Sequence, residues 1–256
     1  MDKDLFLPRL PVGLIKAAYL AAPGNEIESG KFASPESSAA LVANTFGLFL
    51  EKPGCLPPLP DTDGLGWPAG SLTLEAIMRF PWSAGRHPCL DAAITTGHAL
   101  IGVESKRYEP FRHKSAPTLS NAYWRTVWGN RMAGYESIRD ALRNGELHFG
   151  RLDAAQLVKH AFGLRTAVHR EARFRGKLPV LFYLYAQPDA WPNGRAIPPQ
   201  ERASHRVEIT TFANAVKGDE VQFLHCTYSE LLADWQKSAN PTIRAHALAV
   251  LSRFTP

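Results

Sequence analysis

The chain has 256 residues, a net charge of +5 at pH 7 and 45% hydrophobic residues, which is typical of a globular protein with one sizeable core. No apolar run approaches the roughly 20 residues of a membrane span, and the Met-Asp-Lys-Asp start is unlike a signal peptide. The three cysteines, Cys55, Cys89 and Cys226, form no CxxC pair, which argues against a zinc cluster or disulfide framework and favours a reducing, cytoplasmic location.

Positive charge is concentrated in the middle of the chain. Residues 105–206 carry 18 Lys or Arg against 8 Asp or Glu, whereas residues 1–104 carry 7 against 11 and residues 207–256 carry 4 against 5. Such an excess in one region is the electrostatic footprint expected for a polyanionic partner. A solvated basic surface without a partner is the alternative that charge alone favours.

The N-terminal part of the chain predicts two helices and a loop. The apolar segment Val12–Ala22 is compatible with a short helix. Ser34 as N-cap and Pro35 in the first helical position predict a second helix, whose apolar residues recur at helical spacing until Pro53. Residues 52–71 are rich in Pro, Gly and Asp and predict a loop.

The first strand of the sheet is predicted at Leu72–Phe80. Within it Glu75 shares a face with Thr73, Ile77 and Arg79 if alternation is regular. A carboxylate in the middle of an apolar strand is costly unless it has a partner. Glu75 is therefore a candidate third acid of a metal site, and pairing with Arg79 is the alternative.

The next stretch predicts a β-hairpin. Two short apolar strands, Leu90–Thr95 and Ala99–Ser105, are joined by Gly97-His98, which suits a tight turn. Counting outward from a two-residue turn puts Asp91 directly opposite Glu104, with Cβ atoms about 5 Å apart.

Side-chain alternation predicts two different faces for this hairpin. Asp91, Glu104 and Lys106 share one face. Their neighbours there are the small residues Ala93 and Gly102, which leave space above the sheet. The other face is expected to be core and carries Leu90, Ala92, Ile94, Ile101, Val103 and Ser105.

This arrangement predicts a cation beside the hairpin. Two carboxylates about 5 Å apart repel each other unless a cation or a shared proton intervenes. Oxygen ligands suit Mg²⁺, which binds through one or two carboxylates plus water and substrate phosphate. Lys106 would then hold or deprotonate an attacking water.

Residues 107–150 interleave basic residues with Tyr123, Trp124, Trp128 and Tyr135. Aromatic and cationic side chains together suit a nucleic-acid surface, through stacking and phosphate contacts. The more common alternative is that these rings form the core of a helical insertion.

Arg151–Leu164 predicts a helix with Asp153 in its first turn and Gly163 near its C-terminal end. Gln156 and His160 are four residues apart and share a helix face. The buried stripe is expected to contain Leu152, Ala155, Leu157, Val158, Ala161 and Phe162.

Lys177–Ala186 is almost entirely apolar and predicts a strand that is buried on both faces. A parallel crossover through the preceding helix would place this strand beside the hairpin. The remaining predicted elements are a helix at Gln200–Val216, a second buried strand at Glu220–Thr227, and helices at Tyr228–Lys237 and Pro241–Phe254.

Asp91, a hairpin and then Glu104-Ser105-Lys106 resemble the signature of the PD-(D/E)XK nuclease superfamily, which has the restriction-endonuclease-like fold. The resemblance covers roughly residues 34–226, although Leu90 stands where the motif often has Pro. It implies an α/β fold with an αβββαβ core, in which helices flank a central mixed sheet and a helical insertion follows the catalytic strand. One domain is expected over 1–256, with segments 1–33 (extension), 34–106 (first helix, first strand and hairpin), 107–150 (basic and aromatic insertion), 151–227 (helix and buried strands) and 228–256 (C-terminal helices).

The resemblance also implies an activity, namely Mg²⁺- or Mn²⁺-dependent hydrolysis of DNA by an endonuclease. Asp91 and Glu104 would bind the ion, with the backbone carbonyl of Ser105 and the carboxylate of Glu75 as further ligands. Lys106 would position or activate the attacking water.

In several branches of this superfamily the following helix carries a Gln and, four residues later, an aromatic residue that orient the water or a phosphate. Gln156 resembles that Gln, with His160 in the aromatic position. The implied partner is double-stranded DNA, and because cutting both strands usually requires two active sites, the resemblance suggests a homodimer.

A catalytically silent protein of the same fold, binding DNA or a protein partner, is the main alternative. The intact set of Asp91, Glu104 and Lys106 argues against it, because a silent relative has no need of three groups that are costly to bury together. A serine hydrolase, an NTPase or a dinucleotide-binding enzyme finds no support, since the sequence has none of their glycine-rich motifs.

Overall fold

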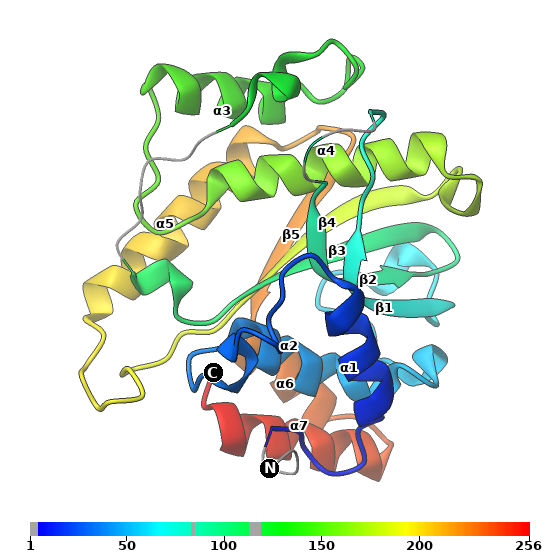
Figure 1. The fold of residues 1–256 in the computed structure, drawn as a ribbon, viewed down its shortest axis with the longest axis vertical. Helices are drawn as coiled ribbons and strands as arrows, with labels where there is room; N and C mark the ends of the chain where they lie inside the picture. Colours follow the sequence, from blue (N-terminus) through cyan, green and yellow to red (C-terminus); the bar gives the residue numbers. More distant parts are fainter. Residues whose placement is uncertain (1–4, 83–84, 86, 113–118) are drawn as a thin grey trace.

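A five-stranded mixed sheet lies at the centre of the molecule (Figure 1). The computed structural model describes residues 5–82, 85, 87–112 and 119–256. Spatial order follows chain order; the first two strand pairings are antiparallel and the last two are parallel. The strands are β1 (Ser71–Ile77), β2 (Cys89–Thr95), β3 (Ala99–Lys106), β4 (Leu178–Tyr185) and β5 (Gln222–Thr227).

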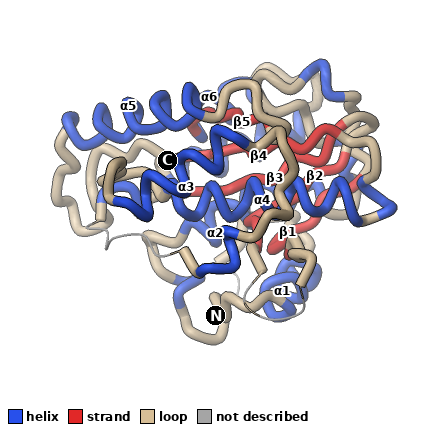
Figure 2. Tube along the Cα trace, turned by 90° about the horizontal axis from the view of Figure 1, so that it is seen from above, coloured by secondary structure: helices blue, strands red, loops and turns tan. Residues whose placement is uncertain are grey.

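Helices cover both faces of the sheet, as predicted for the α/β class (Figure 1). Helix α4, which lies over the sheet in Figure 2, is accompanied on its face by α3 and α5. Helices α2, α6 and α7 cover the opposite face, and α1 packs near β1. The bounds are α1 (Val12–Ala21), α2 (Ser38–Phe46), α3 (Ala133–Asn144), α4 (Ala154–Arg170), α5 (Pro199–Ala215), α6 (Tyr228–Gln236) and α7 (Pro241–Phe254).

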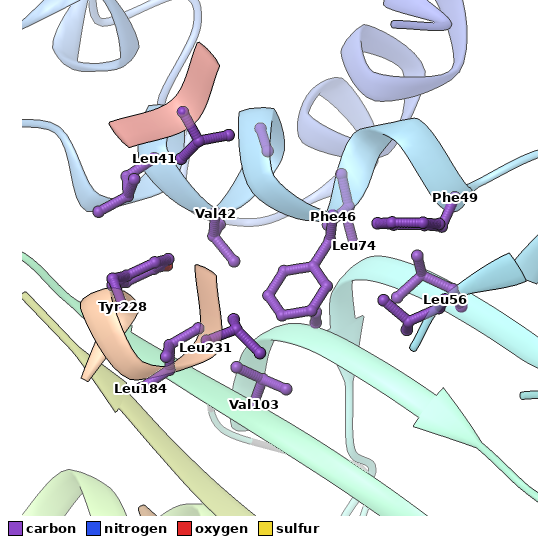
Figure 3. Close-up of a cluster of buried hydrophobic side chains, with 14 of the residues drawn as sticks. Leu41, Val42, Phe46, Phe49, Leu56, Leu74, Val103, Leu184, Tyr228 and Leu231 are labelled. Atoms are coloured by element: carbon purple, nitrogen blue, oxygen red, sulfur yellow. The ribbon is translucent and has the colours of Figure 1, made fainter. Parts of the chain in front are cut away.

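Each face of the sheet has its own hydrophobic core. In the α2 core, the rings of Phe46 and Phe49 (Figure 3) pack edge-on against Trp235, with ring centroids 6.1 and 5.2 Å away. In the α4 core, Trp128 stacks on Phe162 with a centroid distance of 4.2 Å. Full burial of one such ring contributes about 1.5–3 kcal/mol, so the two cores fix the sheet between its helices.

The structure confirms the predicted hairpin and its register. Strands β2 and β3 pair antiparallel, and the N–H of Thr96 donates to the carbonyl of Ala99 at 3.0 Å across the two-residue turn. The pairing follows the predicted register from Thr95–Leu100 to Ala92–Val103 and ends one residue before the predicted Asp91–Glu104 pair; the Asp91 carboxylate accepts the N–H of Ser105. The predicted parallel crossover is also confirmed, because β4 pairs with β3 after the chain has passed through α4.

Strand β1 changes sides at Glu75, where regular alternation was predicted. Leu72 and Leu74 pack into the α2 core, whereas Ala76 and Met78 pack into the α4 core. Unbroken alternation would put all four on one face. The reversal occurs at Glu75, whose φ of 51° lies in the left-handed region that side chains other than glycine rarely adopt.

The side chains of β2 also switch faces, at the place where this strand lies beside Glu75 of β1. The predicted assignment of side chains to the two faces of the hairpin is therefore partly wrong. Ala92 packs into the α2 core, but Leu90 packs into the α4 core. The expected space above Gly102 does not exist, since a Cβ there would lie 2.5 Å from Leu90 and 2.9 Å from Leu164. Gly102 is needed to let α4 pack closely on the sheet.

Three predicted elements differ in their limits or setting. Helix α2 begins after Ser37, whose hydroxyl accepts the N–H of Ala40 at 3.0 Å, and so starts later than the predicted Ser34 cap. Helix α4 extends beyond Gly163 to Arg170. Strand β5 is the edge of the sheet and is only partly buried, contrary to the prediction of a buried strand.

The insertion at 107–150 follows the alternative of a packed helical segment. Tyr123, Trp128 and Tyr135 are buried, and the half-buried Trp124 lies under the guanidinium of Arg143 at 4.2 Å. These rings therefore stabilise the fold instead of presenting free stacking faces. Residues 113–118 of the predicted insertion lie outside the described residues. Among the helices described, none is long and apolar enough to cross a membrane.

Helix α4 carries Gln156 in its first turn, and Asp153 fixes that turn as its N-cap. The Asp153 carboxylate accepts the N–H of Gln156 at 2.9 Å. We expect Asp153→Ala to lower the free energy of unfolding by about 1 kcal/mol, measured by urea denaturation. Asp153→Asn keeps a capping oxygen and is the matched control; an equal loss in both variants would contradict the capping role.

Candidate functional site

Beside the carboxyl end of β3 lies a pocket of about 500 Å³, called here the carboxylate pocket. It is bounded by β1, β2, β3, the first turn of α4 and the N-terminal end of α2. The structure brings all six residues of the predicted site to this pocket, namely Glu75, Asp91, Glu104, Ser105, Lys106 and Gln156.

Glu104 and Lys106 form a buried ion pair at the floor of the pocket. The ammonium of Lys106 lies 2.5 Å from Oε1 of Glu104 and donates to Oε1 of Gln156 at 2.8 Å. Burial alone would raise the pKa of Glu104, but Lys106 and His160 outweigh burial and lower this pKa to about 2. Glu104 is therefore ionised at neutral pH.

Lys106 is held in its protonated form by the surrounding carboxylates. Burial disfavours the ammonium, yet Glu104 and Glu109 more than compensate and raise the pKa of Lys106 above its ordinary value. A protonated lysine donates hydrogen bonds and stabilises negative charge, but it cannot accept a proton from water. The geometry thus favours the positioning role predicted for Lys106 over deprotonation.

Asp91 is a half-buried carboxylate whose charge is only partly compensated by its neighbours. Its Oδ2 accepts the backbone N–H of Ser105 at 2.6 Å. Burial and the neighbouring charge of Glu104 raise the pKa of Asp91 well above its ordinary value, despite the opposing effect of Lys106. A cation near these two acids would relieve both the burial penalty and their mutual repulsion.

Glu75 reaches the pocket from the point where β1 changes sides. Its carboxylate accepts a weak hydrogen bond from the thiol of Cys89 at 3.5 Å. Burial, with added repulsion from Glu26 and Glu104, raises the pKa of Glu75 to about 7. Strained backbone combined with a perturbed carboxyl is typical of functional sites.

Glu75 makes the stability of the fold depend on pH. Between its ordinary pKa of 4.5 and the folded value of about 7, the folded chain binds more protons than the unfolded chain. The free energy of unfolding is therefore expected to fall as pH rises through this interval, by at most roughly 1.4 kcal/mol per pH unit. Glu75→Gln should reduce this slope, which thermal unfolding across the interval measures. Identical slopes in wild type and Glu75→Gln would contradict the assignment of this pH dependence to Glu75.

His160 completes the surroundings of Glu104. Its Nε2 lies 2.9 Å from Oε2 of Glu104, and both side chains are almost fully buried. Gln156 and His160 thus lie on one face of α4, as their spacing predicted, and each contacts a member of the Glu104–Lys106 pair.

Ser38 and Arg112 also line the pocket and were not predicted as part of the site. Ser38 donates to Oε1 of Glu109 at 2.5 Å, and Oε2 of Glu109 accepts the N–H of Arg107 at 2.8 Å. Arg112 pairs with Glu36 at 2.5 Å. Glu109 follows the end of β3 closely in the sequence, whereas no sequence pattern links the start of α2 to this strand.

The donor set of the carboxylate pocket fits a hard divalent cation that keeps part of its water shell. Among the described residues, no three His, Cys, Asp or Glu side chains are grouped so as to hold a metal ion by themselves. Mg²⁺ commonly binds through only one or two carboxylates, with water and substrate phosphate completing its shell. Acids outnumber bases in the lining, with Glu26, Glu36, Glu75, Asp91, Glu104 and Glu109 against Lys31, Lys106 and Arg112.

Comparison with protein-family models, with curated proteins and with solved structures found no match to this chain.

Proposed function

We propose that this chain is a Mg²⁺- or Mn²⁺-dependent endonuclease that hydrolyses DNA, of the PD-(D/E)XK kind. The observation that carries the proposal is the convergence of Asp91, Glu104, Lys106 and Gln156 in one pocket. The element order α2-β1-β2-β3-α3-α4-β4, with α3 as the helical insertion, supports the αβββαβ core that the sequence resemblance implies.

In the proposed site Asp91 and Glu104 would hold the ion together with the backbone carbonyl of Ser105. Glu75 would join them only when it is ionised, because its pKa is raised to about 7. When bound, such an ion supplies Lewis-acid polarisation of a phosphate oxygen and a more acidic water. The oxygen-rich, acid-dominated lining supports this assignment.

Lys106 and Gln156 serve the substrate in this proposal. The charge of the protonated Lys106 stabilises negative charge on the phosphate undergoing attack, and its one remaining N–H orients the water. Gln156 holds the ammonium in place through its side-chain oxygen, 2.8 Å away. His160 in turn orients Glu104 from the opposite side, at 2.9 Å.

DNA is proposed as the substrate because the region that follows the β3 acid is strongly basic. A pocket dominated by carboxylates repels a polyanion, so flanking cations and the metal must offset that repulsion. The homodimer and the cytoplasmic location belong to the same proposal.

One observation favours the silent alternative, a fold that binds DNA or a protein without cutting. Both oxygens of Glu104 already have protein partners, Lys106 at Oε1 and His160 at Oε2. For Glu104 to hold a metal as well, the ion must share an oxygen that already has Lys106 or His160 as its partner. The silent module therefore predicts DNA or protein binding that is indifferent to divalent ions.

Calorimetric titration of Mg²⁺ and Mn²⁺ into the protein, followed by incubation with supercoiled plasmid, tests the proposal. Metal binding and metal-dependent nicking, both abolished by chelation with EDTA, are the expected result. If metal leaves the DNA affinity unchanged and neither Mg²⁺ nor Mn²⁺ supports nicking, the result would instead favour the catalytically silent alternative.

A further inference from the structure

A second pocket, of about 520 Å³, adjoins the carboxylate pocket. We call it the Trp191 pocket; its lining includes Phe111, Arg112, Trp191, Arg195, Pro198 and Glu201. Arg112 lines both pockets, so that a chain-like ligand can pass from one to the other along this guanidinium.

The Trp191 ring is held in place by its surroundings. It stacks on the ring of Tyr108 with a centroid distance of 5.2 Å and an interplanar angle of 21°. Tyr108 is itself buried with Phe111 and Ile197. Trp191 also accepts and donates backbone hydrogen bonds across a small loop, its N–H reaching the carbonyl of Arg195 at 2.8 Å. An aromatic ring fixed before binding loses little entropy when a ligand stacks on it.

The pocket is cationic at its rim. The guanidinium of the exposed Arg195 lies over the Trp191 ring at 5.0 Å and forms no ion pair with any residue that the structure describes. The one carboxylate of the lining, Glu201, is already paired with Arg151 at 3.1 Å. A preset indole next to an uncompensated guanidinium matches a nucleobase joined to a phosphate.

We propose that the Trp191 pocket binds an unpaired nucleotide of a DNA strand whose neighbouring phosphate enters the carboxylate pocket. The base replaces the Arg195 guanidinium over the Trp191 ring, which stays stacked on Tyr108, and the displaced Arg195 contacts, with Arg112, the phosphates that lead toward Lys106. In a duplex each base face is covered by its neighbours, so only a single-stranded end, flap or loop can use this platform.

This inference deepens the proposed nuclease function by naming its substrate class. It rests on that function only for the direction in which the strand runs, from the Trp191 pocket toward Asp91 and Glu104. Binding of the unpaired nucleotide itself requires no metal and no cleavage, and the two ideas therefore can fail separately.

Fluorescence anisotropy in EDTA with a labelled single-stranded oligonucleotide, and with the duplex of the same sequence, tests the inference. Trp191→Ala is expected to weaken binding of the single strand by about 5- to 150-fold, the range for loss of one stacked base, with little effect on the duplex. Trp191→Phe should restore most of the affinity, and Arg195→Gln should reduce both the affinity and its dependence on salt.

Arg175→Gln, a change of an exposed arginine outside both pockets, is the matched control and should leave binding unchanged. Trp191-dependent binding without any cleavage in Mg²⁺ would support the inference and remove the nuclease proposal. Equal affinities of wild type and Trp191→Ala for the single strand would overturn the inference even if the protein cuts plasmid. The inference would also be overturned if the duplex binds more tightly than the single strand and Trp191→Ala weakens both equally.

Discussion

Glu104→Gln is expected to lower metal-dependent DNA cleavage by at least about 100-fold while the protein remains folded. The amide of Gln has nearly the same shape as the carboxylate of Glu104. Its oxygen can take the place of Oε1, which now lies 2.5 Å from the Lys106 ammonium, and its NH₂ group can face the ring of His160. It removes the negative charge, and a divalent ion is worth several kcal/mol of transition-state stabilisation only when it is held in place. Metal affinity should therefore fall together with cleavage.

Initial rates of plasmid nicking and metal titration measure this effect, and thermal unfolding verifies the fold. Asp91→Asn should behave like Glu104→Gln, because the two carboxylates line the same pocket and their charges interact. Glu146→Gln, which changes an exposed acid outside the carboxylate pocket, is the matched control. Cleavage by Glu104→Gln at the wild-type rate would rule out Glu104 as a metal ligand.

Lys106→Met is expected to destabilise the protein by about 3–5 kcal/mol, because it leaves the carboxylate of Glu104 buried without its cation. Only 2% of the Glu104 side chain is exposed, so water cannot replace the lost partner. The oxygen of Gln156 would also lose its donor. Chemical denaturation in EDTA measures the loss, and Lys106→Arg, which keeps the charge, should lose much less.

Divalent ions should offset part of this loss. In the proposed site a metal and the Lys106 ammonium neutralise the same two acids, Asp91 and Glu104. Mg²⁺ is therefore expected to raise the unfolding temperature of Lys106→Met more than that of wild type, even though cleavage by the variant is lost. An equal effect of Mg²⁺ on the unfolding temperatures of the two proteins would contradict the idea that the metal and Lys106 neutralise the same two acids.

The hairpin and its register were predictable from sequence because local geometry determines them. A two-residue turn at Gly97-His98 fixes which residues face each other, and counting outward from it gives the observed pairs from Thr95–Leu100 to Ala92–Val103. The same holds for Gln156 and His160, whose helical spacing puts them on one side of α4. Each inference needed only neighbouring residues and one regular geometry.

The surroundings of the site depend on tertiary structure and were not predictable in this way. Glu75 breaks the alternation of β1 through a left-handed φ that non-glycine residues seldom adopt, and no residue pattern announced it. Gly102 was expected to open a space, but side chains from β2 and α4 fill it. The hydrogen bond of Ser38 to Glu109 joins segments that are 71 residues apart.

Aromatic residues gave the least reliable sequence signal for function. Trp128 and Tyr135 in the basic insertion are core residues, whereas Trp191, in a loop without a basic run, lines a cationic pocket. Composition cannot separate these cases, because an exposed ring and a buried ring have the same local sequence requirements. Only the packing of Phe162 against Trp128 decides that this ring is inaccessible.

The side change at Glu75 has a further consequence for self-association. Strand β1 ends the sheet, and a regular edge strand offers a row of backbone groups onto which another chain can add a strand. The left-handed residue at Glu75 interrupts this row between Leu74 and Ala76, so an incoming strand finds only short stretches with which to pair. The same distortion that turns a carboxylate toward the pocket thus makes the β1 edge a poor template for strand addition.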